Sequence, residues 1–345
     1  MEPLDEEILN LIVCPRDKRE LRREADWLCC PGGHRYRVVE GIPILLVSEA
    51  EQTHIEGTRA LAVAEAGDAT KLPQFQMGPA EIDPFVKAAI GATNGSLYQH
   101  LVGELNEYPI PALRLPTGDG RSFLEIGCNW GRWCLAAAER GYRPVGSDPS
   151  LKGIRAARRV ARQLGIQVSY LVADGRYLPF RDSTFDQIFS YSVLQHLSKE
   201  NVHLVLSEIH RVLQNGGGCL VQLPNVFGIR CLYHQLRRGF REATDFEVRY
   251  WTVPELRRTF GASVGPPSIE VDGFFSLNPQ ISDLRLFPWR YKMLVLLSHN
   301  LQKLSTRMSA LAYVADSLYA SASKAAAIMP IVDDSRDHHP AIASR

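Results

Sequence analysis

Glycines and carboxylates recur where β-rich segments end, between residues 122 and 190. Gly127 and Gly131 follow the first segment, Asp148 the second and Asp174 the third. In an open parallel sheet the carboxyl ends of the strands share one edge, where ligands bind beside the free N–H groups of helix N-termini. The glycines allow close backbone approach, and a carboxylate such as Asp148 accepts hydrogen bonds from both ribose hydroxyls. The pattern predicts an adenosine-bearing ligand, with Asp174 at the adenine amine.

The turn after the first segment distinguishes between two adenosine-bearing cofactors. A dinucleotide site is typified by G-x-G-x-x-G, whereas this turn has Asn129 between its two glycines. Glu125 stands two residues before the first glycine, where an acidic group suits a cationic amino-acid group and is poorly placed beside a pyrophosphate. This favours S-adenosylmethionine.

The elements that position these residues alternate between β and α patterns from residue 121 onward, which predicts a parallel sheet with helices on both faces. The arginines of the helix at 151–164 predict a solvated face. Residues 286–327 read as helical, and no final antiparallel strand is evident. The expected strands are 122–126, 143–147, 168–172, 185–190, 219–223 and 269–274. The remaining expected helices lie near 132–140, 202–213 and 253–260.

Residues 96–275 resemble the class I S-adenosylmethionine-dependent methyltransferases of the UbiE-like type 11 group. The motifs that carry the resemblance are Leu124-Glu125-Ile126-Gly127-Cys128-Asn129-Trp130-Gly131, Gly146-Ser147-Asp148-Pro149-Ser150, Ala173-Asp174-Gly175, Leu178-Pro179-Phe180, Phe185-Asp186 and Arg211-Val212-Leu213-Gln214-Asn215-Gly216-Gly217. The resemblance implies that the cofactor is bound by Glu125, Gly127, Asn129, Gly131, Asp148, Asp174, Gly175 and Ser190. Asn129 departs from the glycine that is usual in the family, but asparagine tolerates left-handed backbone angles.

The N-terminal segment, residues 1–48, resembles the small zinc-ribbon-like domains related to Trm112. Its two knuckle-like turns offer four zinc ligands, Cys14, Asp17, Cys30 and His34, with Asp17 in place of a second thiolate. Cys29 is an alternative ligand, and a degenerate ribbon that packs without metal is the competing interpretation. Four protein ligands would leave no open position, so the metal would be structural.

A catalytic base is optional, because the sulfonium already carries an activated methyl group. His196, just past the fourth strand, is the candidate base, although a role in capping or orienting the following helix fits the same position. His234, in an Arg- and aromatic-rich insertion at 225–250, could also face an acceptor.

The domain organisation predicted from the sequence is an α/β, Rossmann-like methyltransferase sheet with two additions, a small N-terminal β-rich domain and a C-terminal helical extension. The predicted parts are the zinc-ribbon-like domain 1–48, a linker with short helices 49–95, the methyltransferase domain 96–275, the helical extension 276–330 and a flexible tail 331–345.

The 345 residues include 39 Lys and Arg against 38 Asp and Glu, so the net charge of +1 provides no global positive field for a polyanion. The acidic N-terminus does not resemble a secretory signal, and no apolar run is long enough to span a bilayer, so a cytoplasmic location is expected. The seven cysteines are scattered along the chain, which favours reduced thiols over a disulfide framework.

The favoured function is methyl transfer to an O, N or C acceptor on a small molecule, a sugar or a lipid-linked intermediate. An RNA methyltransferase is the first alternative, suggested by the ribbon and the arginines, and a non-catalytic methyltransferase-like scaffold is the second. Packing on the main domain is the favoured interpretation of the apolar run 293–297, and peripheral membrane contact through the C-terminal helices, based on its basic flank, is the alternative.

Overall fold

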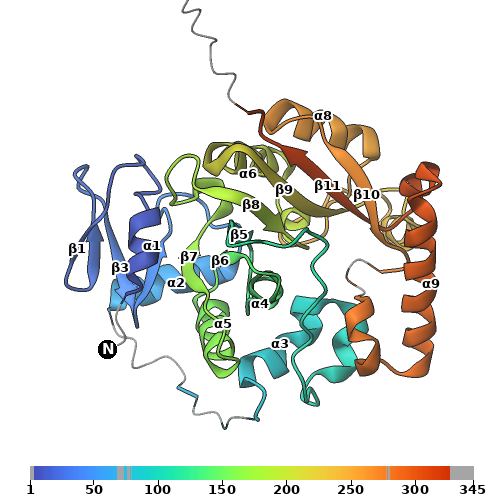
Figure 1. Ribbon diagram of the computed structural model, residues 1–345, viewed down its shortest axis with the longest axis horizontal. Coiled ribbons are helices and arrows are strands. Elements are labelled where there is room, and N and C mark those ends of the chain that lie inside the picture. Colours follow the sequence, from blue (N-terminus) through green and yellow to red (C-terminus); the bar gives the residue numbers. More distant parts are fainter. Residues whose placement is uncertain are drawn as a thin grey trace, which may run out of the picture.

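The structure is a computed structural model that describes residues 4–67, 74–75, 78, 80–276, 278 and 280–326. The tail predicted at 331–345 and its paired histidines lie outside the described residues. A twisted sheet forms the centre of the molecule, and its strands follow the order β1-β2-β3-β4-β7-β6-β5-β8-β9-β11-β10 (Figure 1). Strands β4, β7, β6, β5, β8 and β9 pair in parallel, as the alternating sequence pattern predicted.

The strands of the methyltransferase part lie close to their predicted positions. They are β5 (Ser122–Ile126), β6 (Arg143–Asp148), β7 (Ser169–Ala173), β8 (Phe185–Ser190), β9 (Leu213–Pro224) and β10 (Ser268–Gly273). Because all the parallel strands point the same way, the residues that follow β5, β6 and β7 meet at one edge of the sheet.

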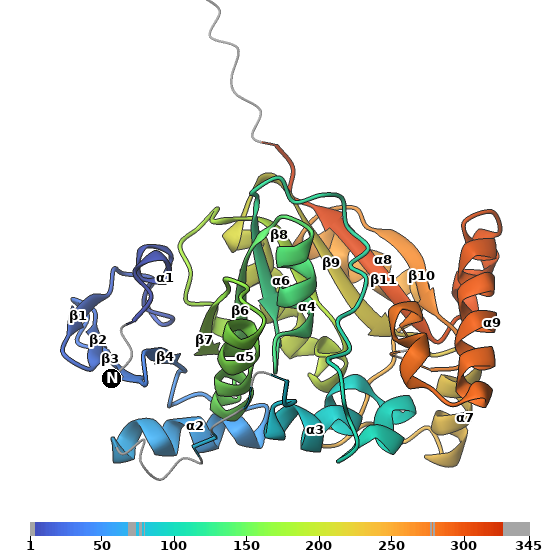
Figure 2. The same ribbon diagram turned by 60° about the horizontal axis from the view of Figure 1, so that its bottom comes forward.

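Helices cover both faces of this sheet (Figures 1 and 2). One apolar core lies against α6 (Lys199–Val212) and α8 (Val253–Ser263), and a second lies against α4 (Arg132–Glu139) and α5 (Leu151–Gln163). The predicted linker contains α2 (Ile55–Ala66) and α3 (Pro84–Asn94), and the insertion contains α7 (Ile229–Arg237). Short 3-10 turns complete the chain at η2 (Ser96–Leu101), η3 (Gly175–Tyr177), η4 (Leu194–His196), η5 (Ile281–Leu286) and η6 (Ser309–Tyr313).

The C-terminal prediction was wrong in part. Helix α9 (Trp289–Ser305) is present, but Ser317–Ser323 forms β11, which inserts antiparallel between β9 and β10. This strand contains mainly serine and alanine, which have low intrinsic strand preference, and it is buried along almost its whole length. Pairing with neighbours on both sides therefore overrides local propensity.

The N-terminal unit is β-rich, as predicted, and contains α1 (Glu6–Leu11), β1 (Arg22–Glu24), β2 (Trp27–Cys29), β3 (Arg35–Val39) and β4 (Ile42–Leu45). Strands β3 and β4 form a hairpin, whose turn residues Glu40 and Gly41 have φ of 50° and 73°. Its second strand, β4, pairs with β7 through Ile44–Val172 and Leu45–Ala173. The small unit thus joins the large sheet and shares its core.

Most of the arginines of α5 are not solvated, which corrects the sequence interpretation, and only Arg162 among them is exposed. Arg155 binds the Glu40 carboxylate through Nε at 2.8 Å and Nη2 at 3.1 Å. Arg159 Nε lies 2.7 Å from Oδ2 of the fully buried Asp83. Spacing along one helix could not reveal these partners, which come from the N-terminal hairpin and the segment before α3.

A first prediction concerns the β4–β7 junction. Leu45→Ala removes a fully buried side chain from the strand that joins the two units, so the free energy of unfolding should fall by about 3 kcal/mol because a cavity forms. Urea unfolding, followed by far-ultraviolet circular dichroism and tryptophan fluorescence, should give one coincident transition for both probes. The matched variant Leu204→Ala, at a side chain 46% exposed, should change stability by less than about 0.5 kcal/mol. Two separate transitions would show that the units fold independently.

Candidate cofactor, acceptor and metal sites

A narrow cavity opens at the carboxyl edge of the sheet, beside the turn that follows β5. It brings together three predicted cofactor residues, Glu125, Gly127 and Asn129, with several that the sequence analysis did not single out. The additional lining residues are Thr93, Asn94, Cys128, Trp130, Arg132, Trp133, Tyr191 and Asn278. Elements from the linker, the sheet and the segment after β10 therefore converge on this cavity.

Glu125 is the buried acid of the cavity, with 2% of its surface exposed. Its Oε2 accepts a hydrogen bond from the backbone N–H of Cys134 at 2.8 Å, within α4. Burial raises the pKa of Glu125 to about 8, so the carboxyl is mostly protonated at neutral pH when no cation is near. A cationic group brought into the cavity would favour the carboxylate form.

Arg132 is a cavity residue that sequence reasoning missed. The side chain is buried, and its Nε and Nη2 have no hydrogen-bond partner among the described residues. Its nearest counter-charge is Asp283, whose Oδ2 lies 3.7 Å from Nη2. Its position directly after Gly131, at the start of a helix, was the available sequence signal. A buried guanidinium with unused donors can bind a ligand carboxylate.

The turn after β5 has the backbone that its sequence requires. Gly127, Asn129 and Gly131 all have positive φ, at 79°, 46° and 80°. A Cβ on Gly131 would lie 2.4 Å from the hydroxyl of Tyr170, so only glycine fits there. Asn129 adopts the left-handed conformation that made it an acceptable replacement for glycine.

Asp148 fixes this turn to the end of β6. Its Oδ2 accepts from the backbone N–H of Asn129 at 2.9 Å, and its Oδ1 accepts from that of Ser150 at 2.8 Å. Burial raises the pKa of Asp148 to about 6. The carboxylate has acceptor capacity left for hydroxyl groups, as its predicted role at the ribose requires.

The other predicted cofactor residues, Gly131, Asp148, Asp174, Gly175 and Ser190, are not among those that line the cavity. The Asp174 carboxylate binds Arg176 through Nη2 at 2.6 Å and Nε at 3.1 Å, so an adenine amine would have to compete with a guanidinium. Gly175 packs against Ile126, where a Cβ would lie 3.0 Å from Cγ2. Ser190 donates to the Ile126 carbonyl at 3.0 Å and is buried. Their roles at the cofactor stay predictions.

A second cavity, of about 260 Å³, shares Asn278 with the first. Its walls include both candidate histidines, His196 and His234, and its other residues are polar or small. These are Ala92, Gly95, Ser96, Ser192, Gln195, Arg230, Cys231, Tyr250, Ser276 and Asp316. Gln195 is 3% exposed, and its Oε1 has no hydrogen-bond partner among the described residues. Gln195 Oε1 is therefore a buried acceptor without a protein partner, on a residue in the wall of the second cavity.

Both ring nitrogens of His196 are engaged. Nδ1 lies 2.7 Å from the Phe246 carbonyl and must donate to it, so Nε2, 3.1 Å from Gln195 Nε2, accepts. Burial lowers the pKa of His196 to about 4, so the ring is neutral at neutral pH. A substrate would have to displace the Gln195 amide to reach Nε2. The contacts suit the orienting role, and action as a base stays a prediction.

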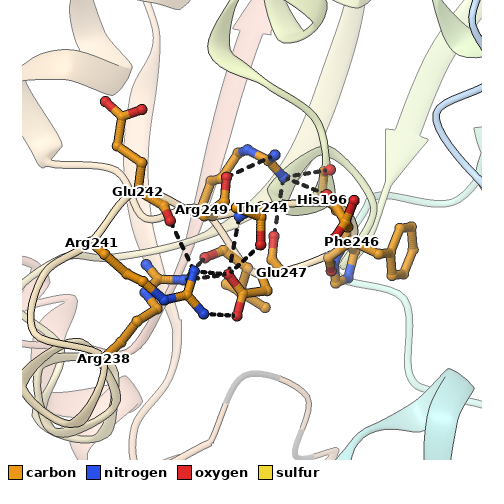
Figure 3. A network of polar contacts seen from close by, with 11 residues as sticks. His196, Arg238, Arg241, Glu242, Thr244, Phe246, Glu247 and Arg249 are labelled. Carbon is orange, nitrogen blue, oxygen red and sulfur yellow. Dashed lines mark hydrogen bonds and ion pairs between the residues drawn. The ribbon is translucent and has the colours of Figure 1, made fainter.

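The loop between α7 and α8 closes over this histidine (Figure 3). The His196 ring stacks on Phe246 with centroids 3.9 Å apart, and Arg249 Nη1 donates to the His196 carbonyl at 2.8 Å. Glu247 holds the loop by accepting from Arg241 at 2.7 and 2.6 Å, and these bonds lower the pKa of Glu247. The insertion thus forms part of the wall of the second cavity.

The four predicted metal ligands, Cys14, Asp17, Cys30 and His34, meet in the N-terminal unit. Their donor atoms all lie within 4.8 Å of one another. His34 Nδ1 lies 3.4 Å from Cys14 Sγ, 3.3 Å from Cys30 Sγ and 3.4 Å from Asp17 Oδ2. Tetrahedral zinc with ordinary bond lengths would separate neighbouring donors by roughly 3.4–3.8 Å. The donor set and spacing therefore fit a structural zinc.

The surroundings of the cluster support that arrangement. A Cβ on Gly32 would lie 2.3 Å from Asp17 Oδ2, so glycine at this position gives the carboxylate its space. The buried Tyr36 hydroxyl lies 3.2 Å from Cys14 Sγ. Cys29, the alternative ligand, points elsewhere, with its Sγ 3.4 Å from Glu24 Oε2.

Comparison with known proteins gives a family for the central part of the chain. Residues 123–217 match a family model described as a methyltransferase domain. A ubiquinone biosynthesis O-methyltransferase of Agrobacterium fabrum is 32% identical over 99 residues, which are 29% of this chain and 39% of that protein. Methyltransferase GfsG of Streptomyces halstedii is 29% identical over 142 residues, which are 40% of this chain and 45% of that protein.

A solved S-adenosylmethionine-dependent methyltransferase of Methanosarcina mazei is 18% identical and covers 64% of this chain and all of that chain, with a TM-score of 0.44. The chain spans less than half the length of the two curated relatives described above. The residues that match the family model, 123–217, include strands β5 to β8 and the turn after β5 that lines the first cavity. Residues 123–217 thus match a methyltransferase domain, in agreement with the resemblance that the sequence motifs carry.

Proposed function

We propose that this chain transfers a methyl group from S-adenosylmethionine to a small-molecule acceptor held in the second cavity. The observation that carries the proposal is the pairing of a buried acid, Glu125, with a buried and underused guanidinium, Arg132, in one cavity at the carboxyl edge of the sheet. The amino-acid end of the cofactor has an ammonium and a carboxylate, which these two side chains complement.

The adjoining cavity is the proposed acceptor site. The unused Gln195 Oε1 would accept a hydrogen bond from an acceptor hydroxyl or amine, which would orient its oxygen or nitrogen toward the methyl group. His196 would hold Gln195 in place and remain neutral. The names of the relatives favour an O-acceptor, and a sugar or lipid-linked molecule is the finer proposal.

The structure gives the RNA alternative less support than the sequence did. Arg155 and Arg159, two of the arginines that suggested RNA, are ion-paired with Glu40 and Asp83. Transfer of a labelled methyl group into metabolite, lipid and RNA fractions would distinguish the acceptor classes. Cofactor binding without transfer into any fraction would favour the scaffold.

We also propose that Cys14, Asp17, Cys30 and His34 hold a structural zinc ion. A bound zinc would neutralise the thiolates and cross-link the two knuckles, because four protein ligands fill its tetrahedral positions. The knuckle at Cys14 leads directly into Lys18, whose Nζ donates to the Leu178 carbonyl at 3.2 Å and to Glu208 at 2.8 Å. The metal would therefore also stabilise the junction with the methyltransferase domain.

S-adenosylmethionine should release close to one proton when it binds at pH 7, because its ammonium converts Glu125 from carboxyl to carboxylate. The buffer takes up this proton, and phosphate and Tris have different enthalpies of protonation. The binding enthalpies measured by calorimetry in the two buffers should therefore differ by the enthalpy difference for one proton. Glu125→Gln should abolish the difference and weaken binding about tenfold or more, the usual effect of losing a charge-assisted hydrogen bond. Release of the same proton by the variant would remove Glu125 from the site.

The same carboxyl should affect stability without ligand. Its pKa in the folded protein, about 8, exceeds the ordinary value of 4.5, so the folded state holds the extra proton between these values. The contribution of Glu125 to the free energy of unfolding should therefore fall as pH rises from about 4.5 to about 8. Urea unfolding should show Glu125→Gln gaining stability relative to the parent protein across that range. A constant difference between the two proteins would contradict this expectation.

Two neighbouring cysteines, Cys30 and Cys29, provide a test variant and a matched control for the metal proposal. Cys30→Ser should purify with less zinc and melt at a lower temperature, whereas Cys29→Ser should retain the parent's zinc, because only Cys30 lies in the cluster. Zinc per chain is measured by mass spectrometry of protein purified without added metal. A Cys30→Ser protein that retains as much zinc as the parent and as Cys29→Ser would exclude Cys30 as a ligand.

A further inference from the structure

Helix α9 is apolar but poorly packed. Of its 17 residues, only Val295 and Ser298 are buried. The exposed apolar side chains recur at helical spacing along the helix. They are Trp289 (73% exposed), Met293 (59%), Leu296 (38%), Leu297 (50%) and Leu304 (42%). A helix held by so few buried side chains leaves an apolar stripe without a partner in the described structure.

Helix α7 repeats the pattern on a second element. Its exposed apolar residues, Ile229, Tyr233 and Leu236, lie on one side and are followed by Phe240, and each of the four is 54–59% exposed. Cys231, Arg230 and His234 lie toward the second cavity instead. The helix therefore separates that cavity from an exposed apolar stripe.

The turn η6 links the two helices. It packs on α9, and its Tyr313 carbonyl accepts from Asn225 Nδ2 at 2.9 Å, just before α7. Gly228, at the start of α7, lies so close to Asp316 that a Cβ there would be 2.5 Å from its Cα. Figure 2 shows both helices at the right-hand end of the molecule. Tyr313 and Val314, each more than 40% exposed, extend the apolar surface between them.

The charges on these two segments are all of one sign. Neither 229–241 nor 289–308 contains Asp or Glu, although the whole chain has nearly equal numbers of acids and bases. Arg238 and Arg241 pair with Glu247 in the following loop. Among the described residues, the other six cations form no ion pair, and they are Arg230, Arg237, Arg290, Lys292, Lys303 and Arg307.

We propose that α7 and α9 dock this protein on the surface of an anionic lipid bilayer. Exposed apolar stripes with Trp and Leu insert at the level of the headgroups, while neighbouring Lys and Arg contact lipid phosphates. A second copy of the chain is the less suitable occupant, because a two-fold contact would bring cations against cations. In the part of the chain that the structure describes, no helix is long and apolar enough to cross a membrane.

Docking would also place the second cavity beside the lipid. Cys231 and His234 line the cavity from α7, whose exposed stripe would face the bilayer. An acceptor with an apolar tail could then keep the tail in lipid while its polar head enters the cavity. This step rests on the proposed methyltransferase function, whereas the docking itself does not.

Vesicle flotation of the full chain tests the docking without any methyl donor. The protein should float with vesicles of phosphatidylcholine and phosphatidylglycerol, bind at least tenfold more weakly to pure phosphatidylcholine, and dissociate as salt is raised. Two double variants, Met293→Ser with Leu236→Ser and Arg237→Glu with Lys292→Glu, should each weaken binding at least tenfold. The charge control is Arg257→Glu with Arg258→Glu on exposed positions of α8, which should bind like the parent.

Several outcomes would overturn the docking proposal. These are equal binding to both kinds of vesicle, retained binding by both double variants, or an equal loss of binding in the control. Size-exclusion chromatography with light scattering would reveal the competing occupant, because a dimer that the apolar variant dissociates would assign the surface to a second copy. Melting temperatures close to the parent's would show that the variants are folded. Retained cofactor binding with lost flotation would separate this surface from the cofactor site.

Discussion

Burial of carboxyl groups at the carboxyl edge of the sheet is the constraint on which the candidate cofactor site depends. Glu125 and Asp148 are held by backbone N–H groups, and burial raises their pKa values to about 8 and about 6. Without ligand, these groups oppose folding at neutral pH. A carboxyl whose pKa is raised by burial costs the folded protein stability when the pH is high enough to ionise it in the unfolded chain. A cationic donor with ribose hydroxyls would supply the missing partners. An edge of this kind would therefore favour a sulfonium cofactor over an anionic one.

The N-terminal unit contacts the sheet near the same carboxyl ends of the strands. Strand β4 pairs with β7 immediately before Asp174, and the knuckle around Cys14 contacts the loop after it through Lys18. The backbone carbonyl of Glu51, just beyond β4, accepts from Arg176 at 2.6 Å, so the partner of Asp174 is itself oriented by the linker. Strand pairing and hydrogen bonds therefore connect the predicted metal ligands and the added strand with the predicted adenine side of the cofactor site.

Much of the fold and part of the site could be predicted from the sequence, because the decisive residues are local. Strand ends, helix stops and the glycine turn depend on neighbours within a few positions, and the four predicted metal ligands lie on two short knuckles. Arg132 was missed because its significance arises from the cavity that α3 and the segment after β10 complete. Strand β11 was missed because serine and alanine indicate no strand until two neighbours bury them.

Asp174 shows how one contact can change the role expected from a motif. The motif places a carboxylate at the strand end, but Arg176 sits two residues later on the turn η3 and binds both carboxylate oxygens. Asp174 is the N-cap of that turn, and its carboxylate also accepts the backbone N–H of Arg176 at 2.9 Å, as an aspartate does in an Asx turn. An adenine amine would thus meet a neutralised carboxylate, and the free energy of recognising it would have to come from stacking and backbone groups. On this reasoning Glu125 and Asp148 would contribute more to cofactor selectivity than Asp174 would, although Asp148 and Asp174 occupy equivalent places in the sequence pattern.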